Sequence, residues 1–227
     1  MYIQNRDVFS VSDILIVVAT ALEAERLPNL SHARVVVSGI GAVNAALATQ
    51  AALLESAPHL ILSAGIGGAY PWGAAAIGDV VVSSELIYAG LGAEDGERLL
   101  GLEELGFPLL ETPERVYNTL AAAPQAREFA GRAGAHFGAI LTLETVTGSP
   151  RSLERLRLAH PEALCEAMEG AGVAHAAVLH GIPVLEIRGI SNMVLDRRDR
   201  DSWRIGAALT ALHTALETGW DGLRLEL

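Results

Sequence analysis

Cysteine, lysine and aromatic residues are scarce or absent in this sequence. Cys165 is the single cysteine among 227 residues, so the chain can form no intramolecular disulfide, and a cysteine-based zinc site is disfavoured. The seven histidines show no HExxH spacing, and we expect no metal site. Aromatic side chains make up only 5% of the residues, and all 16 basic residues are arginine. The composition therefore predicts a core of aliphatic strands covered by alanine-rich helices.

A basic patch and a long apolar run are missing too. The formal net charge of -11 and the pI near 5.0 argue against a nucleic-acid partner. The apolar runs are short and interrupted by glycine, so we expect no membrane-spanning segment. The first residues, MYIQNRDVFSVSD, lack the basic and apolar regions of a signal peptide, which favours a cytoplasmic protein. We expect one domain over residues 1–227, in which residues 1–12 form a flexible N-terminal extension.

Apolar runs of strand length alternate with longer alanine-rich stretches of helical period. This alternation predicts an α/β fold, a three-layer α/β/α sandwich around a central mixed, largely parallel sheet. Strands are expected at Asp13–Ala19, Arg34–Ser38, His59–Ser63, Val80–Ala89, His136–Thr145 and Pro183–Ile190. Helices are expected at Ala42–Glu55, Pro124–Gly134, Pro150–His160, Gly170–His180 and Ser202–Leu216, and residues 90–114 are expected to form a loop.

Glycine-rich or hydroxyl-bearing segments follow three of these strands. In open α/β sheets, ligands bind beyond the carboxyl ends of the strands. Gly39-Ile40-Gly41 fits either a ligand-binding turn or a tight turn that packs a helix closely, and Asn44 stands where a dinucleotide fingerprint has its third glycine. In the run Gly65–Gly68, several small residues together would let backbone N–H groups approach a ligand. The last strand leads into Ser191 and Asn192, which we expect at the same edge of the sheet.

Charged side chains at this edge are candidates for chemistry. Glu23 and Glu25 follow the first strand and are either solvated charges near a helix start or include a carboxylate that activates water. Glu169 stands among alanine and glycine before an apolar helix, where it either favours the helix N-terminus or accepts hydrogen bonds from vicinal hydroxyls. Arg188 lies two residues beyond Glu186 in an apolar strand and either forms an internal salt bridge or orients a carboxylate or phosphate.

Several motifs together resemble the nucleoside phosphorylase superfamily. The sequence contains, in the order and spacing of that superfamily, the motifs GIGAVNAALAT, GIGGA, GDVVVSSE, CEAMEGAGVAHAA and GIPVLEIRGISN. The resemblance runs from Ile14 to about Leu216 and is strongest to the methylthioadenosine/S-adenosylhomocysteine nucleosidases and their relatives, the futalosine hydrolases. It implies a nucleoside phosphorylase-like fold, a purine nucleoside as small-molecule substrate and cleavage of its N-glycosidic bond by water. It also implies that no cofactor is needed and that the chain forms a homo-oligomer, with a dimer expected.

Residue by residue, the resemblance implies roles in one pocket. Glu25 matches the carboxylate that activates the attacking water, and Glu23 is then its neighbour. Glu169 matches the carboxylate that holds the ribose hydroxyls. Arg188 matches the arginine that binds phosphate in phosphorylases and supports the water site in nucleosidases. The remaining implied substrate contacts are with Met168 at the sugar, with the backbone at Thr145 and Val146 at the purine, and with Ile66, Gly67 and Ser191.

Two positions depart from the adenine-specific nucleosidases. Asn192 stands in place of their aspartate, and an amide can donate to O6 or N7 of a 6-oxopurine and so stabilise it as it departs. A site built for one hydrogen-bond pattern rejects the other because its buried groups would be left unpaired. Asn192 therefore favours a hypoxanthine nucleoside such as futalosine. The family's Gly-Ser-Ala-Gly is here Gly65-Ile66-Gly67-Gly68, so a hydroxyl that would help place water or phosphate is missing.

Other functions remain open at this point. A phosphorylase should present several cationic or hydroxyl groups around phosphate, whereas only Arg188 is clear here, with Arg26 as a second candidate. A methylthioadenosine/S-adenosylhomocysteine nucleosidase would act on adenine nucleosides, and a non-catalytic nucleoside-binding protein would not need a water-activating carboxylate. Futalosine carries a benzoate-type carboxylate on its 5′ substituent. Candidate contacts for it lie around Tyr70 and Trp72 or in Arg197–Arg200.

Overall fold

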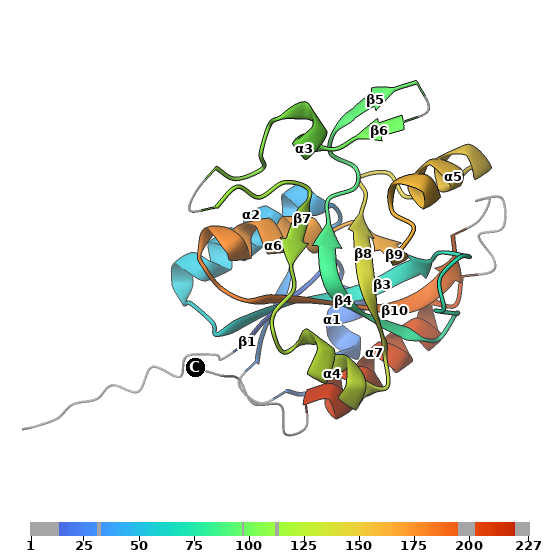
Figure 1. The fold of residues 1–227 in the computed structure, drawn as a ribbon. Coiled ribbons are helices and arrows are strands. Elements are labelled where there is room, and N and C mark those ends of the chain that lie inside the picture. The colour runs from blue at the N-terminus through green and yellow to red at the C-terminus, as the bar shows by residue number, and fades with distance from the viewer. Residues whose placement is uncertain (1–13, 31–32, 97, 112–113, 195–202, 221–227) are drawn as a thin grey trace, which may run out of the picture.

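The computed structural model describes residues 14–30, 33–96, 98–111, 114–194 and 203–220, and Figure 1 shows a sheet with helices on both of its faces. The expected extension, residues 1–12, lies outside the described residues. The sheet is mixed and eight-stranded, in the order β10-β4-β8-β9-β3-β1-β2 with β7 beside β4; β10 also pairs with β3, so five strands form a closed ring of pairings. Its strands are β1 (Ile14–Val18), β2 (Ala33–Val37), β3 (Leu60–Ala69), β4 (Val80–Ile87), β7 (Thr119–Ala121), β8 (His136–Thr142), β9 (Ala163–Ala167) and β10 (Val184–Met193).

Two groups of helices cover the sheet, which confirms the predicted three-layer sandwich. In Figure 1, α2 and α6 pack together on one face, while α1, α4 and α7 lie on the other. Among the described residues, none of the helices is long and apolar enough to span a membrane. The helices that pack around this sheet are α1 (Ala21–Arg26), α2 (Ala42–Glu55), α4 (Ala126–Ala133), α5 (Pro150–Ala159), α6 (Gly170–Leu179) and α7 (Ile205–Trp220).

Side chains of β1 alternate between the two hydrophobic cores beside the sheet. Ile14, Ile16 and Val18 are buried together with residues of α4 and α7. Leu15 and Val17 are buried with residues of α2 and α6. Successive side chains of a strand point to opposite faces, so a strand covered on both faces needs a continuous apolar run rather than an alternating one. The run ILIVV meets that requirement.

The segment expected to be a loop, residues 90–114, contains secondary structure. β5 (Ala93–Asp95) and β6 (Arg98–Leu100) form a hairpin, and α3 (Leu102–Leu105) follows it. The loop prediction was wrong here because each strand has only three residues, too few for a pattern of alternating apolar and polar side chains to develop. The available signal was Gly96, which directly follows β5 and has a φ of +60°, a conformation that favours glycine.

Two strands extend further than the sequence predicts, and β3 does so through its glycine run. β3 continues to Ala69 and β10 to Met193, and the two stay paired in parallel, with Arg188 beside Gly65. Glycine is needed in this strand because neighbouring side chains occupy the space that a Cβ would take. A Cβ at Gly65 would lie 2.6 Å from Nη1 of Arg188 and 2.6 Å from Oε1 of Glu23. The glycine run is therefore part of the sheet and not a loop beyond it.

The other expected elements occur within a few residues of their predicted bounds. Confirmed are strands β1, β2, β4 and β8 and helices α2, α4, α5, α6 and α7. The short strands β7 and β9 were not predicted. Residues 21–26, which the predicted elements leave unassigned, form α1, which begins with a capping box between Thr20 and Glu23. The pattern T-x-x-E before an apolar segment is a sequence signal for such a start.

Close packing of α2 on α6 depends on Gly172, which leads to a stability prediction. A Cβ at Gly172 would collide with the backbone carbonyl of Ala42, which cannot move without displacing α2. Gly172→Ala should therefore lower the free energy of unfolding by about 1–3 kcal/mol, measured by urea denaturation. Gly131→Ala is the matched control, because Gly131 lies in α4 with open space around it and should gain about 0.5–1 kcal/mol. Equal stability of the two variants would contradict this account of the packing.

Candidate active site

A buried arginine is the centre of the candidate site. Arg188 on β10 is only 1% exposed. Its Nε donates to Glu186 at 2.8 Å, its Nη1 to Glu169 at 3.2 Å, and its Nη2 to the hydroxyl of Ser63 at 3.1 Å. Burial alone would lower the pKa of Arg188, but the carboxylates around it raise the pKa above its ordinary value, so the guanidinium remains charged. Arg188 thus forms an internal salt bridge with Glu186 of its own strand, and it also contacts the carboxylate of Glu169.

Glu23, and not Glu25, faces this arginine. The Glu23 side chain is buried; its Oε2 accepts from the backbone N–H and the hydroxyl of Thr20, each at 2.9 Å. Its Oε1 accepts from the N–H of Ile66 at 3.1 Å and faces Arg188 across the Cα of Gly65. Glu25 is exposed on α1. Residues two apart on a helix point in different directions, so the helix brings one glutamate to the site and leaves the other in solvent.

Glu169 joins the cluster from the start of α6. Its Oε2 contacts Arg188 and accepts from the N–H of Met168 at 3.3 Å. Its Oε1 accepts from the N–H of Gly41 at 3.2 Å. Gly41 has a φ of +97°, a conformation that glycine adopts readily, and this turn aims the N–H at the carboxylate. The segment Gly39-Ile40-Gly41 is thus a tight turn into α2 that also fixes a charged side chain.

Beyond Arg188, β10 places polar groups along the same strand pair. A bulge separates Ile190 from Asn192, which lies beside Gly68 of β3. The hydroxyl of Ser191 lies 3.2 Å from the carbonyl oxygen of Gly67 and 2.9 Å from Oδ1 of Asn192. Asn192 is partly exposed, and its Nδ2 donates to the carbonyl of the next residue at 3.1 Å. The strand pair therefore carries a charged end near Arg188 and an amide end near Asn192.

The buried carboxylate of Glu166 connects the loop between β8 and α5 to the amide end of this strand pair. Glu166 of β9 accepts from the backbone N–H of Thr147 at 2.8 Å, from its hydroxyl at 2.6 Å and from the hydroxyl of Tyr70 at 2.9 Å. Glu166 also pairs with Gly68, the neighbour of Asn192 in the sheet. The preceding loop residues are Thr145, which is exposed, and Val146, which is partly buried.

Tyr70 is part of the interior and does not offer a surface for a 5′ substituent. It is fully buried and stacks on Trp72 with ring centroids 4.4 Å apart. Burial and the adjacent Glu166 raise the pKa of Tyr70 well above its ordinary value, so the hydroxyl keeps its proton and donates a hydrogen bond to the carboxylate. The other candidate for the 5′ group, Arg197–Arg200, lies outside the described residues. Arg26 is exposed at the end of α1.

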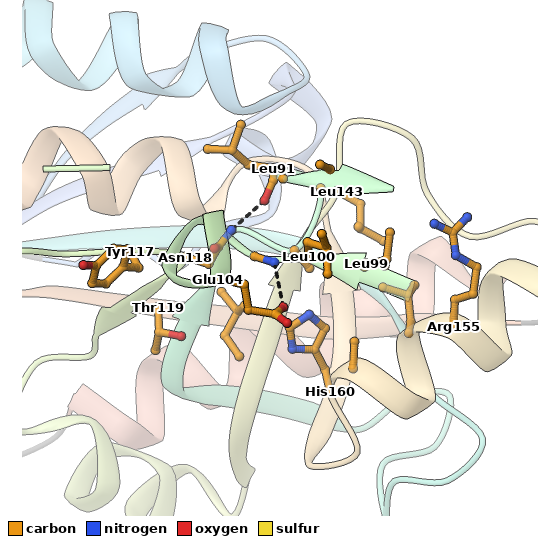
Figure 2. Close-up of a pocket in the computed structure, with 18 of the residues that line it drawn as sticks. Leu91, Leu99, Leu100, Glu104, Tyr117, Asn118, Thr119, Leu143, Arg155 and His160 are labelled. Atoms are coloured by element: carbon orange, nitrogen blue, oxygen red, sulfur yellow. Dashed lines mark hydrogen bonds between the residues drawn. The ribbon is translucent and has the colours of Figure 1, made fainter. Parts of the chain in front are cut away.

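A large cavity is lined by residues other than those of the charged cluster. Figure 2 shows this cavity, of about 1190 Å³, with Leu99, Leu143 and His160 among the side chains around it. Thr145 and Val146 also line it, but the other predicted site residues do not. The cavity therefore adjoins the loop at the amide end, and the charged cluster is a separate feature. Among the described residues, no three histidine, cysteine, aspartate or glutamate side chains are arranged to hold a metal ion.

Comparison with known proteins assigns the chain to a class. The phosphorylase superfamily model matches residues 14–216, so the chain belongs to that superfamily. A solved structure with this fold is the 5′-methylthioadenosine/S-adenosylhomocysteine nucleosidase of Neisseria meningitidis in complex with methylthio-immucillin-A. It matches with a TM-score of 0.76 and 21% identity, over 92% of this chain and 99% of that chain. This likeness confirms the predicted nucleoside phosphorylase-like fold.

Within the superfamily, the chain is similar in sequence to futalosine hydrolases. The chain is 44% identical to the futalosine hydrolase of Streptomyces coelicolor over 184 residues. The aligned region covers 79% of this chain and 74% of the relative. The chain is 36% identical to the futalosine hydrolase of Acidothermus cellulolyticus over 202 residues, which cover 85% of this chain and 79% of that relative. The chain therefore belongs to the futalosine hydrolase family.

Three polar residues that hold the site residues in place were not identified from the sequence. Ser63 and Glu166, polar residues within otherwise apolar strands, were not singled out, and neither was Thr147 in the loop after β8. A buried polar group requires a partner, so a polar residue in such a run is itself a signal. What the sequence could not supply is which residues from distant segments would be those partners.

The Glu166 cluster leads to a prediction for the site's supporting structure. In Glu166→Gln an NH₂ group would replace one carboxylate oxygen and face groups that are themselves donors. The free energy of unfolding should fall by about 1–3 kcal/mol, as expected when a buried donor loses its acceptor, and urea denaturation measures this. Glu162→Gln, at an exposed glutamate of the preceding turn, is the matched control. If both variants were as stable as the parent protein, the cluster would not hold the loop.

Proposed function

We propose that this protein hydrolyses the N-glycosidic bond of futalosine, releasing hypoxanthine and dehypoxanthine futalosine in menaquinone biosynthesis. The observation that carries the proposal is the buried cluster in which Arg188 lies between Glu169 and Glu23. In such a cluster, one carboxylate can bind the hydroxyls of a sugar and another can accept a proton. The 44% identity to a protein named futalosine hydrolase supports this substrate over other purine nucleosides. A protein that only bound nucleosides would have no use for the second carboxylate.

Glu169 is proposed to hold the ribose hydroxyls. Contacts with Arg188 and with the N–H of Gly41 fix the direction of its carboxylate. An ionised carboxylate has about four acceptor positions, and Arg188 and the N–H groups of Gly41 and Met168 occupy three of them. One ribose hydroxyl can therefore be accepted directly, and the second would replace the 3.3 Å contact with Met168. Met168, partly buried beside it, would pack against the sugar ring. The ribose would thus be held before the bond to the purine breaks, and holding the reacting groups in position lowers the barrier.

Glu23 is proposed as the base that activates water, in place of Glu25. The water oxygen forms a bond to C1′ while the C1′–N9 bond breaks, and the bonding electron pair leaves with the purine. Glu23 accepts the proton that the water gives up. Arg188 keeps both carboxylates oriented. The transition state resembles an oxocarbenium ion, so negative charge fixed nearby stabilises it. The backbone at Ile66 and Gly67 would line the site of this water.

Asn192 is proposed to stabilise the departing purine. The contact with Ser191 orients its amide, and the bulge in β10 leaves it partly exposed. An amide can donate to O6 or N7 of hypoxanthine, which matches a 6-oxopurine better than adenine. The backbone at Thr145 and Val146 would contact the other edge of the purine, because their loop is tied to β9 next to Gly68.

A homodimer is proposed as the assembly. Apolar side chains are exposed on α2 and the strand and turn before it, and contiguous apolar patches on a protein surface mark interaction sites. These residues are Val35, Val37, Ile40, Val43, Leu47 and Leu54, with exposures between 43% and 77%. A second copy of the same surface would cover them. A cytoplasmic location and a single domain over residues 1–227 stay predictions from the sequence.

The test of the proposed function is purine release from several nucleosides. Hypoxanthine release would be measured from futalosine and from inosine, with and without phosphate, and adenine release from methylthioadenosine. We expect release from futalosine in the absence of phosphate and little from the other two nucleosides. A requirement for phosphate would make the protein a phosphorylase, and efficient adenine release would make it a nucleosidase for methylthioadenosine.

Exchange of each glutamate on α1 distinguishes the proposed base from its neighbour. Glu23→Gln should lower kcat for hypoxanthine release by about 10²- to 10⁴-fold, because proton transfer to the carboxylate is lost. Glu25→Gln should stay within about twofold of the parent protein, as is usual for an exposed surface change. Steady-state kinetics with futalosine measures both. A large loss in Glu25→Gln with full activity in Glu23→Gln would reverse the assignment.

Asn192→Asp tests the choice of purine. A carboxylate can accept from the amino group of adenine but, when ionised, cannot donate to O6 of hypoxanthine. The ratio of kcat/KM for hypoxanthine release to that for adenine release should fall by about 10²-fold or more. Paired measurements with futalosine and methylthioadenosine supply the ratio. An unchanged ratio would show that the amide does not read the base.

A further inference from the structure

The guanidinium of Arg188 has its three nitrogens engaged by the protein. Nε contacts Glu186, Nη1 contacts Glu169, and Nη2 contacts Ser63. An arginine that recognises phosphate does so by presenting two parallel N–H groups to two oxygens of the anion. In this structure the single N–H of Nε is engaged by Glu186, so the edge of the guanidinium that combines Nε with an Nη is closed to such an anion.

The charges around Arg188 oppose an anion as well. Three carboxylates, those of Glu23, Glu169 and Glu186, surround this one guanidinium, and all are largely buried. Glu23 and Glu169 have proposed roles in hydrolysis, whereas Glu186 has none. Glu186 is fully buried, and its Oε2 has no hydrogen-bond partner among the described residues. A carboxylate placed at such cost beside a cation calls for an explanation beyond the salt bridge.

The surrounding structure accommodates Glu186 specifically. It lies opposite Ser63 in the parallel pairing of β3 and β10, and its backbone N–H donates to the hydroxyl of Ser83 at 3.0 Å. A Cβ at Gly170 would collide with the Glu186 carboxyl group, so glycine at the first residue of α6 makes room for it. The pKa of Glu186 lies above its ordinary value, because burial and the nearby Glu169 raise it by more than the contact with Arg188 lowers it. The start of α6 adds partial positive charge that also favours the ionised form.

We propose that Glu186 is a positioning residue that excludes phosphate from the site, by engaging Nε of Arg188 and by adding a buried negative charge beside it. This inference rests on the proposed hydrolysis and explains why water, rather than phosphate, is the acceptor. Water is neutral and needs no free guanidinium edge. A phosphate anion would need that edge and would be repelled by the excess of carboxylates at short range, where the dielectric screening is weak.

Phosphate binding and phosphorolysis by Glu186 variants test this proposal. Glu186→Gln keeps the shape and an acceptor for Nε but removes the charge, and Glu186→Asp keeps the charge. Inorganic phosphate would be titrated by calorimetry into the parent protein and both variants. Removing one charge at this range should tighten phosphate binding by about 10- to 100-fold in Glu186→Gln. Glu186→Asp and Glu85→Gln, an exposed glutamate of β4, should bind phosphate no better than the parent protein.

Product analysis gives the second readout. In phosphorolysis, an oxygen of hydrogen phosphate bonds to C1′ as C1′–N9 breaks, the electron pair leaves with the purine, and the purine takes the proton from phosphate. Glu186→Gln should therefore form some ribosyl 1-phosphate product from futalosine when phosphate is present, or be inhibited by phosphate competitively. The parent protein should show neither effect. Glu186→Leu removes the charge at similar volume and repeats the test if the amide variant does not fold.

The outcomes separate this inference from the function on which it rests. If the parent protein hydrolyses futalosine without phosphate and the uncharged variants bind phosphate no better than it does, only the inference fails. Competitive binding of phosphate to the parent protein would also overturn it, whatever the variants do. If the parent protein requires phosphate for purine release, the proposed hydrolysis itself fails.

Discussion

The guanidinium of Arg188 is a full positive charge buried inside a sheet, and it is stable there only because carboxylates meet it on several sides. The free energy lost when a cation is removed from water exceeds the free energy gained from its neighbours, unless every contact is well made. Much of the local structure follows from that requirement. Gly65 has no side chain because Arg188 and Glu23 occupy the space, and Gly170 has none because Glu186 lies against it. The cluster and the glycines around it therefore form one unit.

The fold brings this unit together from segments far apart in the chain. Glu23 comes from the first helix, Glu169 from the start of α6 and Arg188 from the last strand. Glu23 and Arg188 meet because β1, β3 and β10 are parallel neighbours in the sheet. Glu169 reaches them from the other direction, because it follows β9, which pairs antiparallel with the end of β3. α2 contributes through the turn at Gly41, which donates an N–H to Glu169. A rigid scaffold of this kind suits a reaction that depends mainly on position and charge.

Much of the fold could be predicted from the sequence, because the strong signals are local. The continuous apolar run of β1 has the length of a buried strand, and the alanine-rich stretches of α2 and α6 have the length and composition of helices. The hairpin at 93–100 was missed since its strands are too short to show a period. The full length of β3 was missed since glycine in a strand usually marks an end, and here it marks a close approach of side chains. That approach depends on Arg188 and Glu23, which are distant in sequence.

The candidate site could be predicted in its composition but not in its connections. Glu169, Arg188 and Asn192 were identified from their motifs, and the structure brings the first two into contact. The sequence does not distinguish Glu23 from Glu25, because the choice depends on which way a six-residue helix is turned by its capping box. Glu186 was noted only as the neighbour of Arg188 in the strand. Its burial, its unpartnered oxygen and its closeness to Gly170 are properties of packing that a single sequence does not carry.

The most direct test of the account is a crystal structure of the Glu23→Gln variant with futalosine bound. We expect ribose hydroxyls on Glu169, the hypoxanthine ring beside Asn192, and a water near residue 23 on the opposite side of C1′. Futalosine bound in the cavity of Figure 2, without contact to Glu169 or to the residues around Arg188, would contradict it.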